Sequence, residues 1–411
     1  MIALTLALRN LWKNRRRSLA TLLAIAVGFA AINLFAGYVR DVYQGLRAAA
    51  IHGEGLGHLT IAKRGFFEGG SLNPAHFIFN KAEMDRLRAI IVSEPGVVLA
   101  TPQLSASGLV SNGKLSTIFI ADGEDPEAAG RLRANPLRSA EPAQAGLDPS
   151  RPAAGLVSQD LAGMLGAASG SSLTVMTTTL AGQTNALDLD VIGTWDTGTA
   201  ASNDKFLRLP LAYVQQLLDT DGASRVVVLL DESLDADRMR AALGAKLGAA
   251  GFDVDMRTWV ERSNFYRQVK NLFDLIFLFL FSIVFIVVLM SIVNTLSMSV
   301  MERVREIGTL RALGMRKGGV VRLFAVEGGV LGAFGCLFGA AFTGVTAAAV
   351  NAAHIQYTPP SSSNPVPLTV AVVSGTLAGS LLVLSLVAML AACWPARRAA
   401  RVEIVDALGH V

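Results

Sequence analysis

Cysteine is almost absent from this sequence, since only Cys336 and Cys393 occur among its 411 residues. Both lie within or beside apolar runs near the C-terminus, so the long region 38–270, which contains no cysteine, can contain no disulfide. The Cys and His spacings that bind zinc are also missing, and the five histidines are scattered. Three of them, His52, His58 and His76, are too widely spaced in the sequence to indicate a metal site. The sequence therefore predicts neither a disulfide framework nor a metal centre.

Motifs of common catalytic sites are missing as well. The chain has no H-E-x-x-H, no G-x-S-x-G and no glycine-rich dinucleotide fingerprint. Residues 108–115, GLVSNGKL, come within one position of a phosphate-binding loop, but Leu115 stands where a metal-binding hydroxyl is required. We interpret this run as a turn between strands. An intramembrane enzyme is accordingly the weakest functional hypothesis.

Charged residues are few and apolar residues are many. Only 17% of the residues are charged, whereas 52% are hydrophobic, and the mean hydropathy is +0.46. This composition excludes an ordinary soluble enzyme. Crossing a bilayer takes about 20 apolar residues, and four runs are long enough. We predict an α-helical integral membrane protein with four transmembrane helices and a large extracytoplasmic α+β domain between the first two. The transmembrane helices are predicted at residues 18–37, 271–300, 323–350 and 368–393.

Lys and Arg cluster beside these runs, which is a pattern of membrane orientation and not of nucleic-acid binding. They occur before the first run, between the second and third, and after the fourth, whereas residues 351–367 contain none. Both termini are therefore predicted to be cytoplasmic. The first run is too long for a cleaved signal peptide, so we interpret it as an anchor. The predicted cytoplasmic parts are 1–17, 301–322 and 394–411, and the predicted outer parts are 38–270 and 351–367.

The outer region is long enough for one large or two small domains. Runs rich in β-branched residues alternate with amphipathic runs, which favours an α+β fold. Residues 124–152 contain five prolines and little periodicity, and we predict a loop or a subdomain boundary there. Polar helical runs at 38–51 and 259–271 are predicted to act as stalks. Strands are predicted at 57–63, 115–121, 187–195 and 225–231, and helices at 81–93, 211–218 and 236–247.

Residues 301–315, MERVREIGTLRALGM, have the pattern of a short amphipathic helix after the second apolar run. Val304, Ile307 and Leu310 share one side, and Gly314 can end the helix. Such a helix could be a solvated connector or a docking surface for a soluble partner, and the pattern leaves both open. Its polar side is predicted to consist of Glu302, Arg305, Glu306 and Thr309.

Glycines recur along the third apolar run at spacings of four and three residues, which places them on one helix face. Small residues let helix backbones approach closely, so this face is predicted to pack on a neighbouring helix. Glu327 of the same run is interpreted as an interfacial carboxylate near Arg322, and Asn294 of the second run is expected to form an interhelical hydrogen bond. The predicted packing residues are Gly328, Gly332, Gly335 and Gly339.

These segments also resemble a known family. Residues 302–315, followed by a glycine-rich span that begins at Glu327, are similar to the signature of FtsX-like, MacB-type ABC transporter permeases. The N-terminal run 7–28 and the C-terminal run 394–408, WPARRAARVEIVDAL, resemble the same family. Within the outer region, GTWDTG at 193–198 is similar to it as well.

The resemblance implies a separate cytoplasmic ABC ATPase that binds residues 301–315, and a second permease subunit, identical or different. It implies that this chain is not an enzyme and binds no cofactor, with ATP and Mg held by the ATPase. It also implies a multi-pass protein of the bacterial inner membrane, in which ATPase closure moves the spans and the stalks transmit this motion outward. The docking residues carried over from the signature are Glu302, Arg303, Arg305, Glu306, Ile307, Gly308, Leu310, Arg311, Leu313 and Gly314.

Two departures bear on the branch of the family. Ile404 stands where many members have a proline, and the ATPase is not fused to this chain. In the second departure, and in the run GHLTIA around His58, the chain resembles the lipoprotein-releasing, LolC/LolE-like branch. The expected function is mechanotransmission onto a lipoprotein, lipid or other hydrophobic or periplasmic cargo, including efflux. The alternative is an FtsX-like signalling scaffold that activates a cell-wall hydrolase. An adaptor, a lipoprotein or a hydrolase would be the outer partner, and no nucleic acid is expected.

Overall fold

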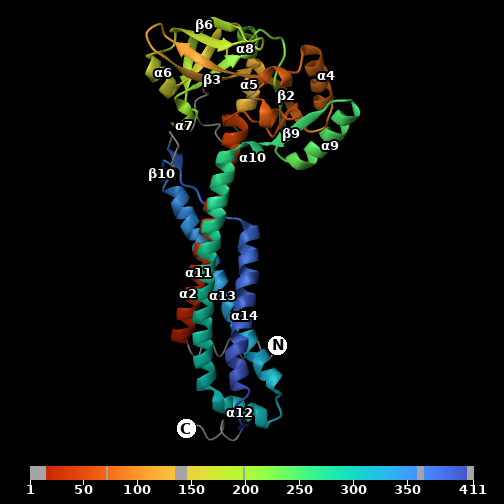
Figure 1. Cartoon of the computed structure of the whole chain (residues 1–411). Coiled ribbons are helices and arrows are strands. Elements are labelled where there is room, and N and C mark those ends of the chain that lie inside the picture. Colours follow the sequence, from red (N-terminus) through yellow and green to blue (C-terminus); the bar gives the residue numbers. More distant parts are fainter. Residues whose placement is uncertain (1–14, 71–72, 135–145, 198–199, 359–364, 405–411) are drawn as a thin grey trace. The chain divides into compact units, whose positions relative to one another are not determined.

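The chain divides into two compact units in the computed structural model (Figure 1). The structure describes residues 15–70, 73–134, 146–197, 200–358 and 365–404. The membrane unit comprises Met1–Tyr43, Lys270–Tyr357 and Pro367–Val411, and the outer unit comprises Gln44–Val269 and Thr358–Val366.

Long apolar helices dominate the membrane unit. Among the described residues, four helical segments are long and apolar enough to cross a membrane. They belong to α2 (Arg15–Ala48), α11 (Asn264–Glu302), α13 (Lys317–Ala352) and α14 (Ser374–Ala399). The shorter elements are α12 (Val304–Ala312), β10 (Gln356–Tyr357) and β11 (Val366–Pro367).

One apolar cluster holds these helices together. It includes Phe29 of α2, Ile292 of α11, Leu331 of α13 and Leu384 of α14, all of them buried. Each helix therefore contributes one apolar stripe to a common core, while much of its remaining surface is apolar and exposed, as expected for contact with lipid.

A single nine-stranded sheet forms the centre of the outer unit, with the order β3-β7-β4-β6-β5-β2-β8-β1-β9, and β3 also pairs with β2, so the strands from β3 to β2 close on themselves. Most neighbours are antiparallel, whereas β3 with β7 and β4 with β6 are parallel. The strands are β1 (Leu59–Lys63), β2 (Val97–Ser111), β3 (Ser116–Glu124), β4 (Ala154–Ser158), β5 (Ser172–Thr178), β6 (Thr184–Trp195), β7 (Phe206–Pro210), β8 (Arg225–Leu230) and β9 (Val254–Thr258). This region thus forms one compact unit around one sheet.

Helices pack on one face of this sheet. Residues of α6 and α8 pack on Leu104 and Phe119, and residues of α4 and α9 pack on Val226 and Val228. The opposite face is covered in part, where Ile51 and Trp259 pack on Val227 and where Leu147 packs with Leu156 and Trp195. The helical segments are η1 (Ala49–Gly53), α3 (Phe66–Gly69), η2 (Pro74–Phe77), α4 (Lys81–Val92), α5 (Pro126–Arg133), α6 (Gln159–Leu165), α7 (Ala200–Asn203), α8 (Leu211–Leu218), α9 (Ala236–Ala249) and α10 (Trp259–Arg262).

Several sequence-based boundaries agree with the structure. Helix α8 has the predicted bounds, and α4 begins at a capping box in which Asn80 and Glu83 bond to each other's backbone. The prediction of a loop at 124–152 is wrong in part, because Asp125 caps α5 and Pro126 occupies its first turn. The predicted stalk runs are helical, but the second is interrupted at Ser263, which lies between α10 and α11.

Candidate functional site

The segment 301–315 is divided between two helices. Helix α11 continues through Met301 to Glu302, and α12 begins only at Val304. Arg303 lies between them with φ −116° and ψ 18°, outside the helical region. After α12, Gly314 adopts φ +97°, a left-handed conformation that favours glycine. The prediction of one helix over 301–315 is therefore wrong at its start, and the predicted stop at Gly314 agrees with the backbone.

Helix α12 buries one side and exposes the other. Val304, Ile307 and Gly308 are buried, and Ile307 packs on Val320 and Phe324 at the start of α13. Arg311 donates a hydrogen bond to the carbonyl oxygen of Val402. Leu310 and Arg311 are half-buried, and the exposed residues are Glu302, Arg305, Glu306, Thr309, Leu313 and Gly314.

An ion pair fixes the start of α12. Arg303 Nη1 lies 3.4 Å from Glu327 Oε2, and these side chains are only 10% and 5% exposed. From the sequence, Glu327 is predicted to lie near Arg322, but Arg322 is exposed and the partner of Glu327 is Arg303. Of the predicted docking residues, Arg303 therefore belongs to the interior, where it connects the α11–α12 junction to α13.

The predicted glycine face of α13 contacts α14 and α2, and at Gly328 also Leu296 of α11. A Cβ at Gly332 would lie 2.7 Å from the Cβ of Ala388 in α14, and Gly328 faces the same helix. A Cβ at Gly339 would lie 2.8 Å from the carbonyl oxygen of Ala26 in α2, and Gly335 also faces α2. The four glycines thus permit close contacts within this chain.

Asn294 does not form the expected interhelical bond. Its side chain is exposed on α11, and it has no hydrogen-bond partner within the part of the chain that the structure describes. That expectation is wrong for contacts within one subunit.

Two of the distant histidines meet in the outer unit. His52 Nε2 and His58 Nε2 lie 3.7 Å and 3.9 Å from Glu232 Oε1, whereas His76 is exposed elsewhere. The backbone N–H of Leu230 donates to His58 Nδ1, so in the neutral ring the proton sits on Nε2. Burial lowers the pKa of His58 to about 4, against the opposing effect of Glu232. The Nε2 proton makes this ring a poor metal ligand, and the described residues contain no cluster suited to a metal.

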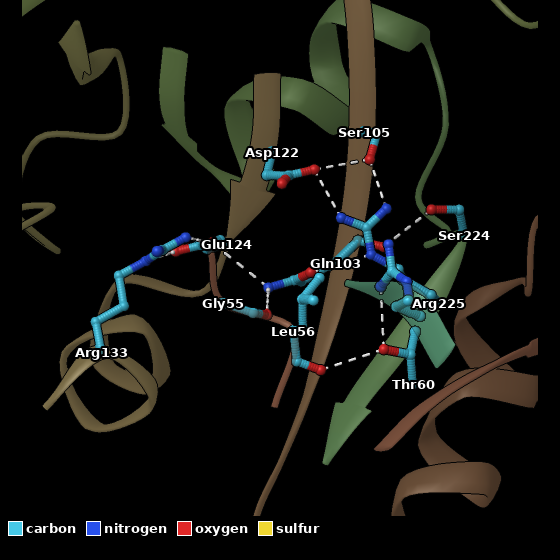
Figure 2. A network of polar contacts seen from close by, with 11 residues as sticks. Gly55, Leu56, Thr60, Gln103, Ser105, Asp122, Glu124, Arg133, Ser224 and Arg225 are labelled. Carbon is cyan, nitrogen blue, oxygen red and sulfur yellow. Dashed lines mark hydrogen bonds and ion pairs between the residues drawn. The ribbon is translucent and has the colours of Figure 1, made fainter. Parts of the chain in front are cut away.

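A polar network lies on the partly covered face of the sheet (Figure 2). Arg225 of β8 donates through Nη2 to Asp122 Oδ1 at 2.6 Å, and through Nη1 to Ser105 Oγ at 2.5 Å. Its Nε donates to Gln103 Oε1 at 3.0 Å. Burial alone would raise the pKa of Asp122, but Arg225 and Ser105 hold it below its usual value. Asp122 is therefore an ionised partner of Arg225, and strands β2, β3 and β8 are joined.

A second ion pair extends this network toward η1 (Figure 2). Glu124 is 1% exposed and accepts two hydrogen bonds from Arg133 of α5, of which that from Nε measures 3.0 Å. Arg133 Nη1 also donates to the carbonyl oxygen of Gly53 at 2.5 Å. Gln103 Nε2 lies 3.4 Å from both Glu124 Oε1 and the carbonyl oxygen of Gly55.

This network is not predicted by the sequence. Its one available signal is the alternation of Asp122 and Glu124 in a strand of otherwise apolar residues, which predicts acidic groups on one sheet face. Their partners lie far away in the sequence and carry no local signal. The run 108–115, which resembles a phosphate loop, leads into a turn between β2 and β3, as predicted. In this turn Asn112 Oδ1 accepts hydrogen bonds from the N–H groups of Lys114 and Leu115.

Comparison with known proteins identifies both parts of the chain. Residues 277–404 match the FtsX-like permease C-terminal family, and residues 18–246, more than half of the chain, match the MacB-like periplasmic core domain. The lipoprotein-releasing system transmembrane protein LolC of Xylella fastidiosa is 22% identical over 360 residues, which are 82% of this chain and 80% of LolC. An uncharacterized ABC transporter permease of Methanocaldococcus jannaschii is 26% identical over 141 residues. These residues are 33% of this chain and 35% of that relative, so the match spans about a third of each protein.

Two solved structures are similar to about half of this chain. The periplasmic region of MacB from Actinobacillus actinomycetemcomitans is 12% identical, with a TM-score of 0.37 over 53% of this chain and 95% of that one. The extracellular domain of the transporter YknZ from Gram-positive bacteria is 15% identical, with a TM-score of 0.32 over 49% of this chain and 99% of that one. On the two family matches, this chain belongs to the FtsX-like ABC transporter permeases that carry a MacB-like periplasmic core domain.

Proposed function

We propose that this chain is the permease subunit of an ABC transporter whose separate cytoplasmic ATPase docks on α12. ATP hydrolysis by that ATPase moves the membrane helices, and these move the outer domain. The observation that carries the proposal is the exposed polar side of α12, with Arg305, Glu306 and Thr309 directed away from the buried Ile307. The near-match to a phosphate-binding loop at 108–115 forms the end of β2 and a β-hairpin turn instead.

The contacts of α12 support its role as a lever. Arg303 pairs with Glu327 of α13, and Arg311 bonds to Val402, which follows α14. Ile307 packs in the same cluster as Val300 near the end of α11. A displacement of α12 would therefore act on α11, α13 and α14 together, because packed interiors transmit strain. Both termini are proposed to be cytoplasmic, in a bacterial inner membrane.

A charge reversal on the exposed side tests the docking. Glu306→Lys should reduce co-purification of the full chain with its ATPase, and the stimulated ATP turnover, by about tenfold if one charge-assisted contact is lost. Glu403→Lys is the matched control, because Glu403 is also an exposed glutamate on the predicted cytoplasmic side, outside α12. Equal binding and turnover for Glu306→Lys and the wild type would contradict docking at this face.

The cargo proposed is a lipoprotein, a lipid or another hydrophobic periplasmic molecule, and a second permease subunit is proposed to complete the transporter. The support is the relationship to LolC, which extends over 82% of this chain. Cross-linking of the full chain in cells would test the class of cargo. Acylated proteins or lipids among the products agree with transport, whereas a cell-wall hydrolase as the main product would favour the signalling alternative.

A further inference from the structure

Arg208 of β7 is a buried cation without a hydrogen-bond acceptor among the residues that the structure describes. Its side chain is stacked on Trp195, with Cζ 4.6 Å from the centre of the ring, and the residue is 6% exposed. Burial, together with the nearby Arg133, lowers the pKa of Arg208 to about 9 against the opposing effect of Glu124 and Asp122. A buried charge is normally paired, so this guanidinium indicates a missing anion.

The neighbouring carboxylates are already engaged. In the parallel pairing of β3 with β7, Asp122 lies beside Arg208 and therefore on the same sheet face. Asp122 binds Arg225, and Glu124, two residues further along β3, binds Arg133. Arg225 and Arg133 therefore each have a bonded carboxylate on this face, whereas Arg208 has none among the described residues.

An apolar strip begins next to this charge. Ile120 and Ile118 precede Asp122 on the same face of β3, and they are 38% and 61% exposed. Leu109 of β2 lies opposite Ile118, and Met176 of β5 lies opposite Leu109. All four side chains are exposed, because the helices that pack on this region cover the other face of the sheet. The strip is therefore a continuous apolar surface across three strands.

We propose that this face binds an anionic amphiphile of the phospholipid class, with its phosphate on Arg208 and an acyl chain along the strip Leu109, Ile118, Ile120 and Met176. A guanidinium matches a phosphate with two parallel hydrogen bonds, and the strip offers the apolar surface that an acyl chain needs. A second copy of the chain fits less well, because it would bring the same positive charge of Arg208 to the face. The inference deepens the proposed function and rests on it for the class of cargo.

Photo-cross-linking of the full chain tests this site. The chain is placed in phosphatidylcholine nanodiscs without ATPase, and lysophosphatidylglycerol with a diazirine on its acyl chain is compared with the matching lysophosphatidylcholine. We expect the anionic probe to label β2, β3 and β5 at least about tenfold more, the factor that one charge-assisted hydrogen bond supplies. Arg208→Gln should abolish this difference, and Arg208→Lys should retain part of it. Arg64→Gln, at an exposed arginine of the same unit, is the control and should change nothing.

Ile118→Ser provides a second test that does not depend on the buried arginine. Ile118 is exposed, so its replacement should leave the fold intact and reduce labelling by both probes. Equal labelling by the two probes in the wild type, or an unchanged preference in Arg208→Gln, would overturn the proposal. Efficient disulfide formation between Ile118→Cys subunits would also overturn it, in favour of a second copy. Because no ATPase is present, none of these outcomes bears on docking at α12.

Discussion

Replacing Arg303 by methionine removes the cation that faces Glu327 between the α11–α12 junction and α13. The two groups lie 3.4 Å apart with their side chains only 10% and 5% exposed, so water screens them little. Breaking a buried ion pair on one side costs about 3–5 kcal/mol, because the remaining charge stays in a poorly solvated place. The loss affects the segment that holds α12, so the proposed docking face should also lose its fixed position.

Thermal unfolding of the full chain in detergent, together with stimulated ATP turnover, measures this effect. Arg303→Met should lower the midpoint and the turnover, and the double variant Arg303→Met with Glu327→Met should recover most of the stability, since an apolar pair can replace a buried ion pair at little cost. Arg322→Met is the control and should change stability by less than about 0.5 kcal/mol, because Arg322 is exposed. A double variant no more stable than Arg303→Met would refute the reasoning.

Two further predictions concern packing and pH. Gly332→Val should destabilise the helix bundle by about 1–3 kcal/mol, because a Cβ at Gly332 would lie 2.7 Å from the Cβ of Ala388. Gly344→Val is the control and should be tolerated, because a Cβ at Gly344 would meet nothing within 4 Å. Thermal unfolding of the two variants measures the difference. The outer unit should lose up to about 3 kcal/mol of stability as the pH falls from 6.5 to about 4, because His58 binds its proton less readily when folded than when unfolded. Hydrogen exchange in β1 and β8 would measure this loss, and His58→Gln should flatten the pH dependence; an unchanged slope would show that another group titrates.

Local patterns predicted the elements whose boundaries depend on local chemistry. Helix α8 lies at the predicted 211–218, because its spacing of apolar residues is unambiguous. The end of α12 just before Gly314 follows in the same way from the conformational freedom of glycine. Helix α5 was missed because the prolines of 124–152 were interpreted as helix breakers, although Pro126 stands in the first turn, where its missing N–H costs nothing.

The partners of charged side chains could not be predicted from the sequence. Glu327 was assigned to Arg322 because they are close in sequence, but the backbone turn at Arg303 brings a more distant arginine to it. Arg225 and Asp122 are 103 residues apart, and only the sheet order brings them together. Such pairs depend on topology, which periodicity does not determine.

The position of β1 between β8 and β9 has a consequence for biogenesis. Leu59, near the start of the outer unit, lies opposite Val228 and Thr258, near its end. During synthesis β1 therefore remains without its partner strands β8 and β9 until almost the entire outer unit has been exported. Assembly of the sheet should be slow and vulnerable to aggregation, and a chaperone on the outer side would be most useful in that interval.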